Sequence, residues 1–130
     1  MSRYIYILVS FFCIISCSTQ KNVSSKAFLY YGKTKCLGKC PVFDMYFFDN
    51  GKVMYEGFEN VEVIGKKELK ISSEDIRFLK NELEKVNFSQ ETSIKRDIPN
   101  TILRYNDKKL ITQNRESIKV LLEYLEKVSP

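Results

Sequence analysis

Segments that fold back on one another through tight turns set the strongest limit on how this chain can fold. Asn50-Gly51 lies between two apolar runs. Asn-Gly in that position is a strong hairpin signal, and it predicts a two-residue type I′ turn that pairs Phe48 with Val53. Further strands are predicted at residues 27–31 and 61–71. Strands joined by short turns are antiparallel, so we expect a largely antiparallel sheet.

The second half of the chain adds another hairpin and two helices. The hairpin is predicted around Asn106-Asp107, and apolar residues recur at helical spacing in residues 72–88 and again near the C-terminus. Ser72 and Asn114 can cap these two helices. The predicted fold class is α+β: one small domain, residues 27–130, with a mainly antiparallel sheet built from hairpins and two helices packed on one face.

The N-terminal residues match an export signal and lie outside the predicted domain. Arg3 precedes an apolar run at residues 4–15, which ends in Ser16-Cys17. A basic start, a short apolar core and a small residue before the cut are typical of a signal peptide. As a helix the run would cover about 18 Å, which is too short for a bilayer core of about 30 Å. We therefore expect residues 1–16 to be a signal peptide and not a lasting transmembrane anchor.

Residues 14–17, Ile-Ile-Ser-Cys, resemble a bacterial lipobox, which implies that Cys17 becomes lipidated. The alternative is an ordinary cleavage site beside an incidental thiol. With lipidation, residues 17–26 form a flexible basic tether whose acyl chains bind the lipid bilayer. Lipoproteins that are exported to the outer surface look to share acidic residues just after the cysteine. Residues 18–22 of this chain contain no acidic residue. We therefore expect a lipid-anchored protein of the cell envelope, on the periplasmic face of the outer membrane.

Composition and charge exclude several classes of function. The 130 residues contain no histidine, which excludes catalytic triads with a histidine base and zinc sites built on imidazole. The net charge is +5, but the positive excess lies in the tether and the first loop. The tether is either simply solvated or attracted to anionic lipid head groups. We expect no nucleic-acid binding, because the rest of the chain is close to neutral, and no cofactor or bound metal.

Cys36 and Cys40 enclose the most distinctive segment, residues 36–40, which we call the cysteine loop. The envelope is oxidising, so the pair is predicted to form a disulfide. Gly38 supplies the conformational freedom that such a tight turn can require, and Pro41 favours an extended start to the next strand. The alternatives are a redox-active pair, two unpaired thiols, or two metal ligands, although zinc needs four ligands.

The segment Cys36-Leu37-Gly38-Lys39-Cys40-Pro41-Val42-Phe43 resembles the C-x-G-x-C-P-x-aromatic signature of a bacterial lipoprotein domain family of unknown function. The resemblance continues through Tyr55-Glu56-Gly57 to Asp97-Ile98-Pro99-Asn100, and it covers residues 28–127. It implies a small envelope domain and names no reaction.

We therefore expect a non-enzymatic binding or scaffolding module of the envelope. Its candidate binding residues are Lys35, Lys39 and Asp97, and its candidate partner is an envelope protein or a glycan. One alternative is an inhibitor of a cell-wall hydrolase that inserts the cysteine loop into its target. A less favoured alternative is an enzyme: a glycosidase using Glu56 and Asp97, if their carboxyls lie within about 10 Å, or a thiol exchanger, if a disulfide here is readily reduced.

Overall fold

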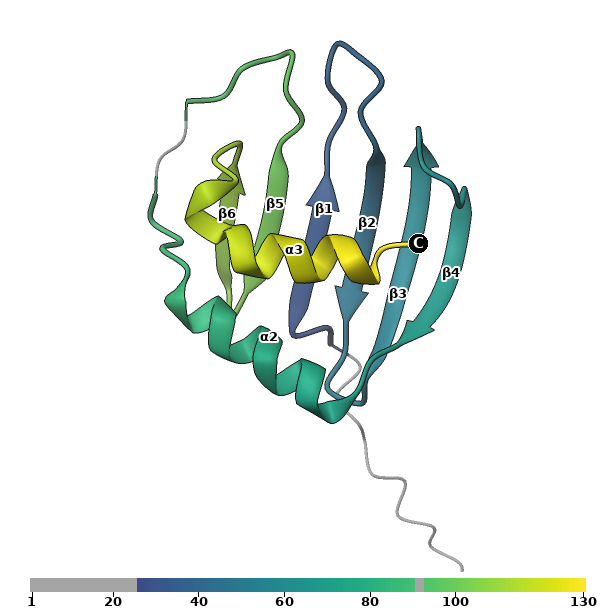
Figure 1. The fold of residues 1–130 in the computed structure, drawn as a ribbon, viewed down its shortest axis with the longest axis vertical. Helices are drawn as coiled ribbons and strands as arrows, with labels where there is room; N and C mark the ends of the chain where they lie inside the picture. The colour runs from purple at the N-terminus through teal and green to yellow at the C-terminus, as the bar shows by residue number, and fades with distance from the viewer. Residues whose placement is uncertain (1–25, 91–92) are drawn as a thin grey trace, which may run out of the picture.

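Six strands form one antiparallel sheet in the computed structural model, which describes residues 26–90 and 93–130 (Figure 1). The strand order is β4-β3-β2-β1-β5-β6, so the first strand lies inside the sheet. The predicted signal peptide, residues 1–16, and residues 17–25 of the predicted tether lie outside the described residues. The strands are β1 (Leu29–Lys33), β2 (Val42–Phe47), β3 (Lys52–Glu59), β4 (Gly65–Lys70), β5 (Thr101–Tyr105) and β6 (Lys108–Thr112).

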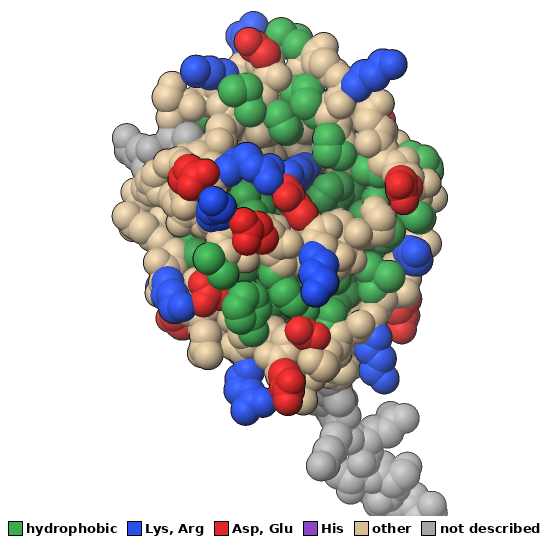
Figure 2. Space-filling model, in the orientation of Figure 1, with side chains coloured by type: hydrophobic (Ala, Val, Ile, Leu, Met, Phe, Trp, Pro, Cys, Tyr) green, Lys and Arg blue, Asp and Glu red, His purple; other side chains and the backbone are tan. Residues whose placement is uncertain are grey.

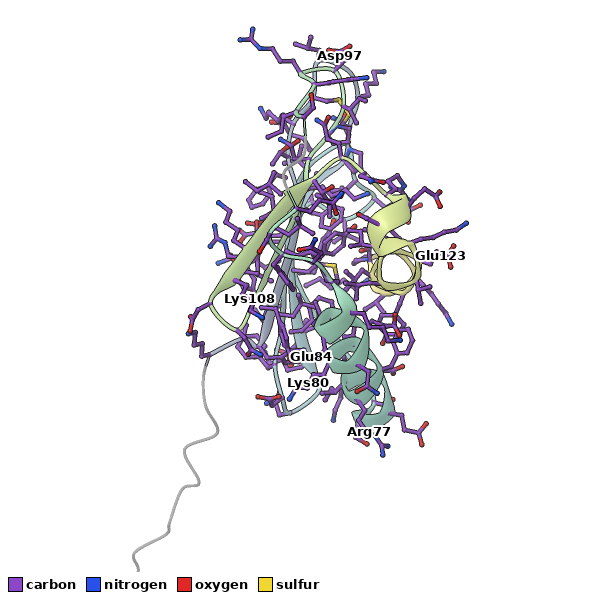
Figure 3. The ribbon with its side chains drawn as sticks, turned by 90° about the vertical axis from the view of Figure 1, so that its left-hand side faces the viewer. Arg77, Lys80, Glu84, Asp97, Lys108 and Glu123 are labelled. Atoms are coloured by element: carbon purple, nitrogen blue, oxygen red, sulfur yellow. A yellow bond between two sulfur atoms is a disulfide. The ribbon has the colours of Figure 1, made fainter. Side chains whose placement is uncertain are left out.

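Two helices cover one face of the sheet, which confirms the predicted α+β fold (Figures 1 and 3). They are α2 (Ser73–Lys85) and α3 (Lys119–Val128), and a short 3₁₀ turn, η1 (Glu116–Ile118), precedes α3. The predicted cap of α2 is present, because Ser72 Oγ accepts a hydrogen bond from the Asp75 N–H at 3.1 Å. A carboxylate oxygen of Asp75 in turn accepts one from the Ser72 N–H at 3.0 Å. Asn114 leads into η1 instead of capping α3 directly.

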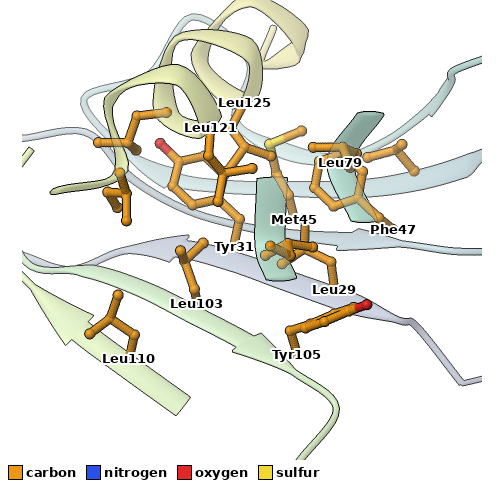
Figure 4. Close-up of a cluster of buried hydrophobic side chains, with 14 of the residues drawn as sticks. Leu29, Tyr31, Met45, Phe47, Leu79, Leu103, Tyr105, Leu110, Leu121 and Leu125 are labelled. Atoms are coloured by element: carbon orange, nitrogen blue, oxygen red, sulfur yellow. The ribbon is translucent and has the colours of Figure 1, made fainter. Parts of the chain in front are cut away.

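The core lies between the helices and the sheet (Figure 4). Side chains of a strand alternate between the two faces of a sheet, so every second residue points toward the helices. Burying each large apolar side chain contributes about 1.5–3 kcal/mol. The residues at the centre of this layer, all fully buried or nearly so, are Leu29, Tyr31, Met45, Phe47, Leu79, Leu103, Leu121 and Leu125.

The other side of the sheet, which we call the open face, is not covered by either described helix (Figure 3). It is formed by the alternate strand residues, among them Tyr30, Asp44, Tyr46, Arg104 and Lys109. The sequence prediction that both helices pack on one face is therefore correct, and it leaves a mixed aromatic and charged surface behind.

The β2–β3 turn differs from the predicted two-residue type I′ turn. The Phe48 N–H donates to Lys52 O at 2.9 Å, and the Gly51 N–H donates to Phe48 O at 3.0 Å, so the loop contains three residues. Gly51 has a φ of +85°, as expected for the left-handed residue that ends a three-residue hairpin loop. As a result Phe47, and not Phe48, pairs with Val53. This slip of one residue moves Phe47 and Val53 to the helix-covered face.

The second hairpin has the turn type that was predicted for the first. Asn106 and Asp107 have φ values of +47° and +61°, and the residues on either side, Tyr105 and Lys108, are paired. Both central residues therefore lie in the left-handed region that defines a type I′ turn. The strand predicted at residues 61–71 is shorter than expected, because β4 begins only at Gly65.

Candidate functional site

The predicted disulfide is present in the connection between β1 and β2. Cys36 and Cys40 are bonded, and their Cα atoms are 5.8 Å apart, within the range usual for disulfides. The pair is therefore neither two unpaired thiols nor two metal ligands. Gly38 is not in the left-handed region, and a Cβ there would meet only Cys36 Sγ, at 3.8 Å. The loop thus closes without the conformational freedom that the sequence suggested Gly38 would supply.

The β3–β4 turn supports the cysteine loop from one side. Asn60 Nδ2 donates to Cys40 O at 3.0 Å, and Lys35 Nζ lies 2.5 Å from a Glu59 carboxylate oxygen. Asn60 has a φ of +53°, a left-handed conformation that asparagine tolerates better than most residues. The turn therefore places an amide donor against the backbone at the end of the loop.

Residues 93–100 support the loop from the other side, and Gln113 holds this segment in place. The two N–H groups of Gln113 Nε2 are shared among three acceptors, Lys95 O at 2.7 Å, Ile98 O at 2.9 Å and Asn100 Oδ1 at 2.9 Å. Asn100 and Thr34 then exchange two hydrogen bonds of 3.1 Å each. Sequence reasoning missed Gln113, because a single glutamine after a strand belongs to no recognisable pattern.

These contacts bring the three candidate binding residues to one end of the molecule. Lys35 and Lys39 belong to the connection that carries the cysteine loop, and Asp97 lies at the same end in Figure 3. All three side chains are exposed. Among the residues that the structure describes, neither Lys39 nor Asp97 has a hydrogen-bond or ion-pair partner, so both charges are available to a ligand. We call this end, made of residues 34–41, 58–64 and 93–100, the distal end, because the described chain begins at the opposite end, at Lys26.

The distal end also carries most of the large apolar side chains that reach the surface. Of the seven exposed large hydrophobic residues in the described part of the chain, five lie in the three segments that make up the distal end. Figure 2 shows hydrophobic side chains among the charged ones at the upper end of the helix-covered face. Clustered apolar residues at a surface commonly mark an interaction site. The five are Leu37 (79% exposed), Ile64 (65%), Ile94 (55%), Phe58 (45%) and Ile98 (43%).

An ion-pair cluster fixes the base of the distal end to α3. Lys33, the last residue of β1, lies 2.8 Å from Glu126, and Arg115 lies 2.9 Å from the same carboxylate. Burial alone would raise the pKa of Glu126, but the hydrogen bonds from Arg115 and Lys33 outweigh it and hold the pKa below its usual range. Glu126 therefore stays ionised and ties the strand that enters the cysteine loop to the helix.

The structure does not bring together the two carboxylates considered for glycosidase chemistry. Glu56 lies on β3 opposite Asp44, whereas Asp97 belongs to the segment that leads into β5. Two strands separate β3 from β5, so the backbones of these two strands are about 14 Å apart at about 4.8 Å per strand. Glu56 and Asp97 therefore belong to separate parts of the fold, whereas paired carboxyl groups act on a glycosidic bond at about 5–10 Å.

Comparison with known protein families matches residues 27–129 to a family model. The chain belongs to the DUF6438 family. This family is defined as a domain of unknown function, and the matched residues contain the whole sheet, both helices and the distal end. The prediction of a domain family of unknown function is thereby confirmed for this DUF6438 member. No curated protein and no solved structure matches the chain.

Two further findings concern only the described part of the DUF6438 chain. No helix within residues 26–90 and 93–130 is long and apolar enough to cross a membrane. Within the same residues, cysteine and acidic side chains form no group of three that could hold a metal ion.

Proposed function

We propose that this protein is an envelope lipoprotein that acts as a non-enzymatic binding or scaffolding module, and that its distal end contacts the partner. The observation that carries the proposal is the clustering of exposed apolar residues around a loop closed by a disulfide. A fixed loop loses little conformational entropy on binding, so its contacts contribute more to affinity than those of a mobile one. Lys39 and Asp97 add charges that a partner protein can pair with at the edge of this apolar cluster.

The position of the distal end suits a protein attached to a membrane through its N-terminus. In this proposal Cys17 carries the acyl chains, and residues 18–26 connect it to the domain. A flexible segment of that length has an end-to-end distance of about 17 Å. The described chain begins at the end opposite the cysteine loop, so the distal end would face away from the bilayer, into the periplasm.

Inhibition of a cell-wall hydrolase is a second candidate, and the exposure of Leu37 favours it. Leu37 is 79% exposed within the disulfide-closed loop, and Lys35 and Lys39 stand on either side of it. An exposed aliphatic side chain on a rigid loop can enter a concave active site. The same loop would then bind an enzyme cleft instead of a structural partner.

Substitution of Leu37 tests the proposed contact surface. Leu37→Asp places a charge within the distal end, whereas Val120→Asp places the same charge on α3 at a comparably exposed position (54%). Both variants and the wild-type chain are crosslinked in cells at equal abundance, and the captured proteins are compared by quantitative mass spectrometry. We expect a partner that is recovered with the wild-type chain and with Val120→Asp and is lost with Leu37→Asp. Recovery of the same partners with all three chains would remove the distal end as the binding surface.

The membrane anchor needs a separate test. Metabolic labelling with palmitate should mark the wild-type chain and leave Cys17→Ala unlabelled. An unlabelled wild-type chain would contradict the lipoprotein part of the proposal and would leave the binding test above unaffected. A partner identified as a hydrolase, whose activity falls when the purified protein is added, would favour the inhibitor alternative.

A further inference from the structure

The open face carries a row of aromatic and cationic side chains that the core and the distal end do not use. Lys109, Arg104, Tyr30 and Tyr46 occupy matching positions on the adjacent strands β6, β5, β1 and β2. Residues in register on neighbouring strands lie side by side on the same face. Arg104 therefore stands between Lys109 and Tyr30, and Tyr30 stands between Arg104 and Tyr46.

Tyr30 is held in one orientation by its neighbours. Its hydroxyl donates to Asp44 at 2.6 Å, and its ring centroid lies 5.2 Å from that of Tyr46. A Cβ at position 32 would collide with the Tyr30 hydroxyl and lie 2.9 Å from the Asp44 carboxylate, so only Gly32 leaves room for this arrangement. Burial, with the hydrogen bond to Asp44, raises the pKa of Tyr30 well above its usual range, so the ring remains neutral.

Arg104 and Lys109 of this row, and the neighbouring Lys108, have no carboxylate partner among the described residues. The Arg104 guanidinium lies 5.0 Å from the Tyr30 ring centroid, a cation–π distance. The nearby carboxylate of Asp49 is already paired with a lysine of α2, at 2.6 Å. The local balance of unpaired charge is therefore positive.

These side chains line a hollow with a volume of about 650 Å³, which is within the range of small-molecule sites. The hollow lies at the edge of the open face near the β5–β6 turn, where Lys108 is labelled in Figure 3. Tyr46 is 39% exposed, so its ring is accessible from solvent. The lining therefore combines the accessible Tyr46 ring and three further aromatic side chains with three cations that have no ion-pair partner among the described residues. It also includes the carboxylates of Asp49 and Asp107, which are paired with lysines.

We propose that this hollow binds a carboxylated saccharide, such as a uronic acid or an amino sugar with an acidic substituent. The C–H face of a sugar ring packs on the exposed Tyr46 ring, and its carboxylate forms charge-assisted hydrogen bonds with Arg104 and Lys109. The carboxylates of Asp49 and Asp107 in the lining can accept hydrogen bonds from sugar hydroxyls. This inference is independent of the distal end and of the lipidation of Cys17.

A sugar fits this surface better than the other anionic surfaces of an envelope. None of the exposed aliphatic side chains of the described residues lies in the hollow, so it lacks the aliphatic groups that would enter the apolar part of a bilayer. Acidic side chains also belong to this surface: Asp49 and Asp107 line the hollow, and Asp44 accepts the hydrogen bond from Tyr30 beside it. This mixed lining suits a ligand with many hydroxyl groups and one negative charge better than a densely charged polyphosphate.

Calorimetric titration of the full-length protein in a neutral detergent tests the proposal. The probes are trigalacturonic acid, its neutral methyl ester, N-acetylmuramic acid and inorganic phosphate. We expect at least one of the two acidic sugars to bind. If trigalacturonic acid binds, its neutral ester should bind about tenfold more weakly, because the ester loses the charge-assisted hydrogen bonds. Arg104→Gln and Tyr46→Ala should each weaken acidic-sugar binding by about tenfold or more. Lys66→Gln, an exposed lysine on β4 away from the hollow, should leave it unchanged.

Several outcomes would overturn the assignment. They are the absence of binding by both acidic sugars, equal binding of the acid and its ester, and unchanged binding in Arg104→Gln. Inorganic phosphate that binds as tightly as the sugars would show a general anion site, and it would also overturn the saccharide assignment. Both Arg104 and Tyr46 are exposed and outside the core, so circular dichroism of the variants should match the wild-type spectrum.

Discussion

Removal of the Tyr31 hydroxyl should stabilise the domain. Tyr31 is fully buried under α3, and among the described residues its hydroxyl is the one buried side-chain polar atom without a hydrogen-bond partner. A buried polar group without a partner costs about 1–3 kcal/mol. The ring itself packs edge to face against Phe43, with centroids 5.3 Å apart, and Tyr31→Phe keeps that contact. We therefore expect a gain of about 1 kcal/mol in the free energy of unfolding.

The same substitution at Tyr55 is a matched control with the opposite expected sign. Tyr55 is also buried, but its hydroxyl donates to Val63 O at 3.2 Å. Tyr55→Phe leaves that carbonyl without its donor, so we expect a loss of about 1 kcal/mol. The two variants change the composition in the same way, which removes any general effect of replacing tyrosine by phenylalanine.

Urea unfolding of a soluble form that starts at Ser18 measures both effects. The transition midpoint should rise for Tyr31→Phe and fall for Tyr55→Phe, with unchanged slopes. A change of 1 kcal/mol corresponds to about 4–8 °C in melting temperature for a domain of this size. A destabilised Tyr31→Phe would refute the reasoning, because it would mean that the hydroxyl is hydrogen-bonded in solution.

Three further predictions concern the disulfide, an ion pair and a glycine. The Cys36→Ser/Cys40→Ser variant should lose about 2 kcal/mol of stability, the loop-closure entropy of so short a ring, and an unchanged urea midpoint would contradict this. The pKa of Glu126 is lowered in the folded state. Its carboxylate therefore stabilises the fold at a pH above the pKa that Glu126 has in the unfolded chain, and this stabilisation is lost as the pH falls through the pKa in the folded state. Glu126→Gln should therefore lose less stability than the wild-type chain between about pH 5 and pH 3, and identical thermal unfolding profiles across that range would exclude the ion pair. Gly57→Ala should destabilise the domain by at least about 2 kcal/mol, because the new Cβ would collide with the backbone oxygen of Val63. A soluble variant with the native melting temperature would disprove that clash.

Local signals in the sequence predicted the helices well because each helix carries its own information. The capping box at Ser72 and the apolar stripe that follows it are contained within one segment, and α2 begins where they indicate. The end of α2 was less well predicted, since the helix stops at Lys85 and not near Phe88. Helix ends depend on packing against the rest of the fold, which no local pattern records.

The hairpin turns show why register was harder to predict than strand positions. Asn-Gly fits both a two-residue type I′ turn and the end of a three-residue loop, because both require a left-handed residue at the glycine. Here Gly51 closes the longer loop, and its backbone N–H pairs with Phe48 O. The choice between these two turns decides which face of the sheet each side chain of β3 occupies relative to β2. An ambiguity in one turn therefore changes which side chains are predicted to be buried and which exposed.

The candidate sites were only partly visible in the sequence. Cys36, Cys40 and Asp97 stand out as residue types, and the structure places them at one end. The support from Gln113 and the row that includes Arg104 depend on residues that meet only after the sheet has formed. Pairing of β1 with β5 joins segments about seventy residues apart, and single-sequence patterns do not report contacts over such distances.

The two outer strands of the sheet determine how copies of this domain behave at high local concentration. β4 carries Lys66, Lys67 and Lys70, and β6 carries Lys108 and Lys109. An unprotected outer strand offers free backbone groups to a neighbouring chain, and lysines on that strand oppose the approach of a second copy with like charge. Crowding of many copies would therefore bring like charges together at both outer strands, which opposes extension of the sheet from one molecule to the next.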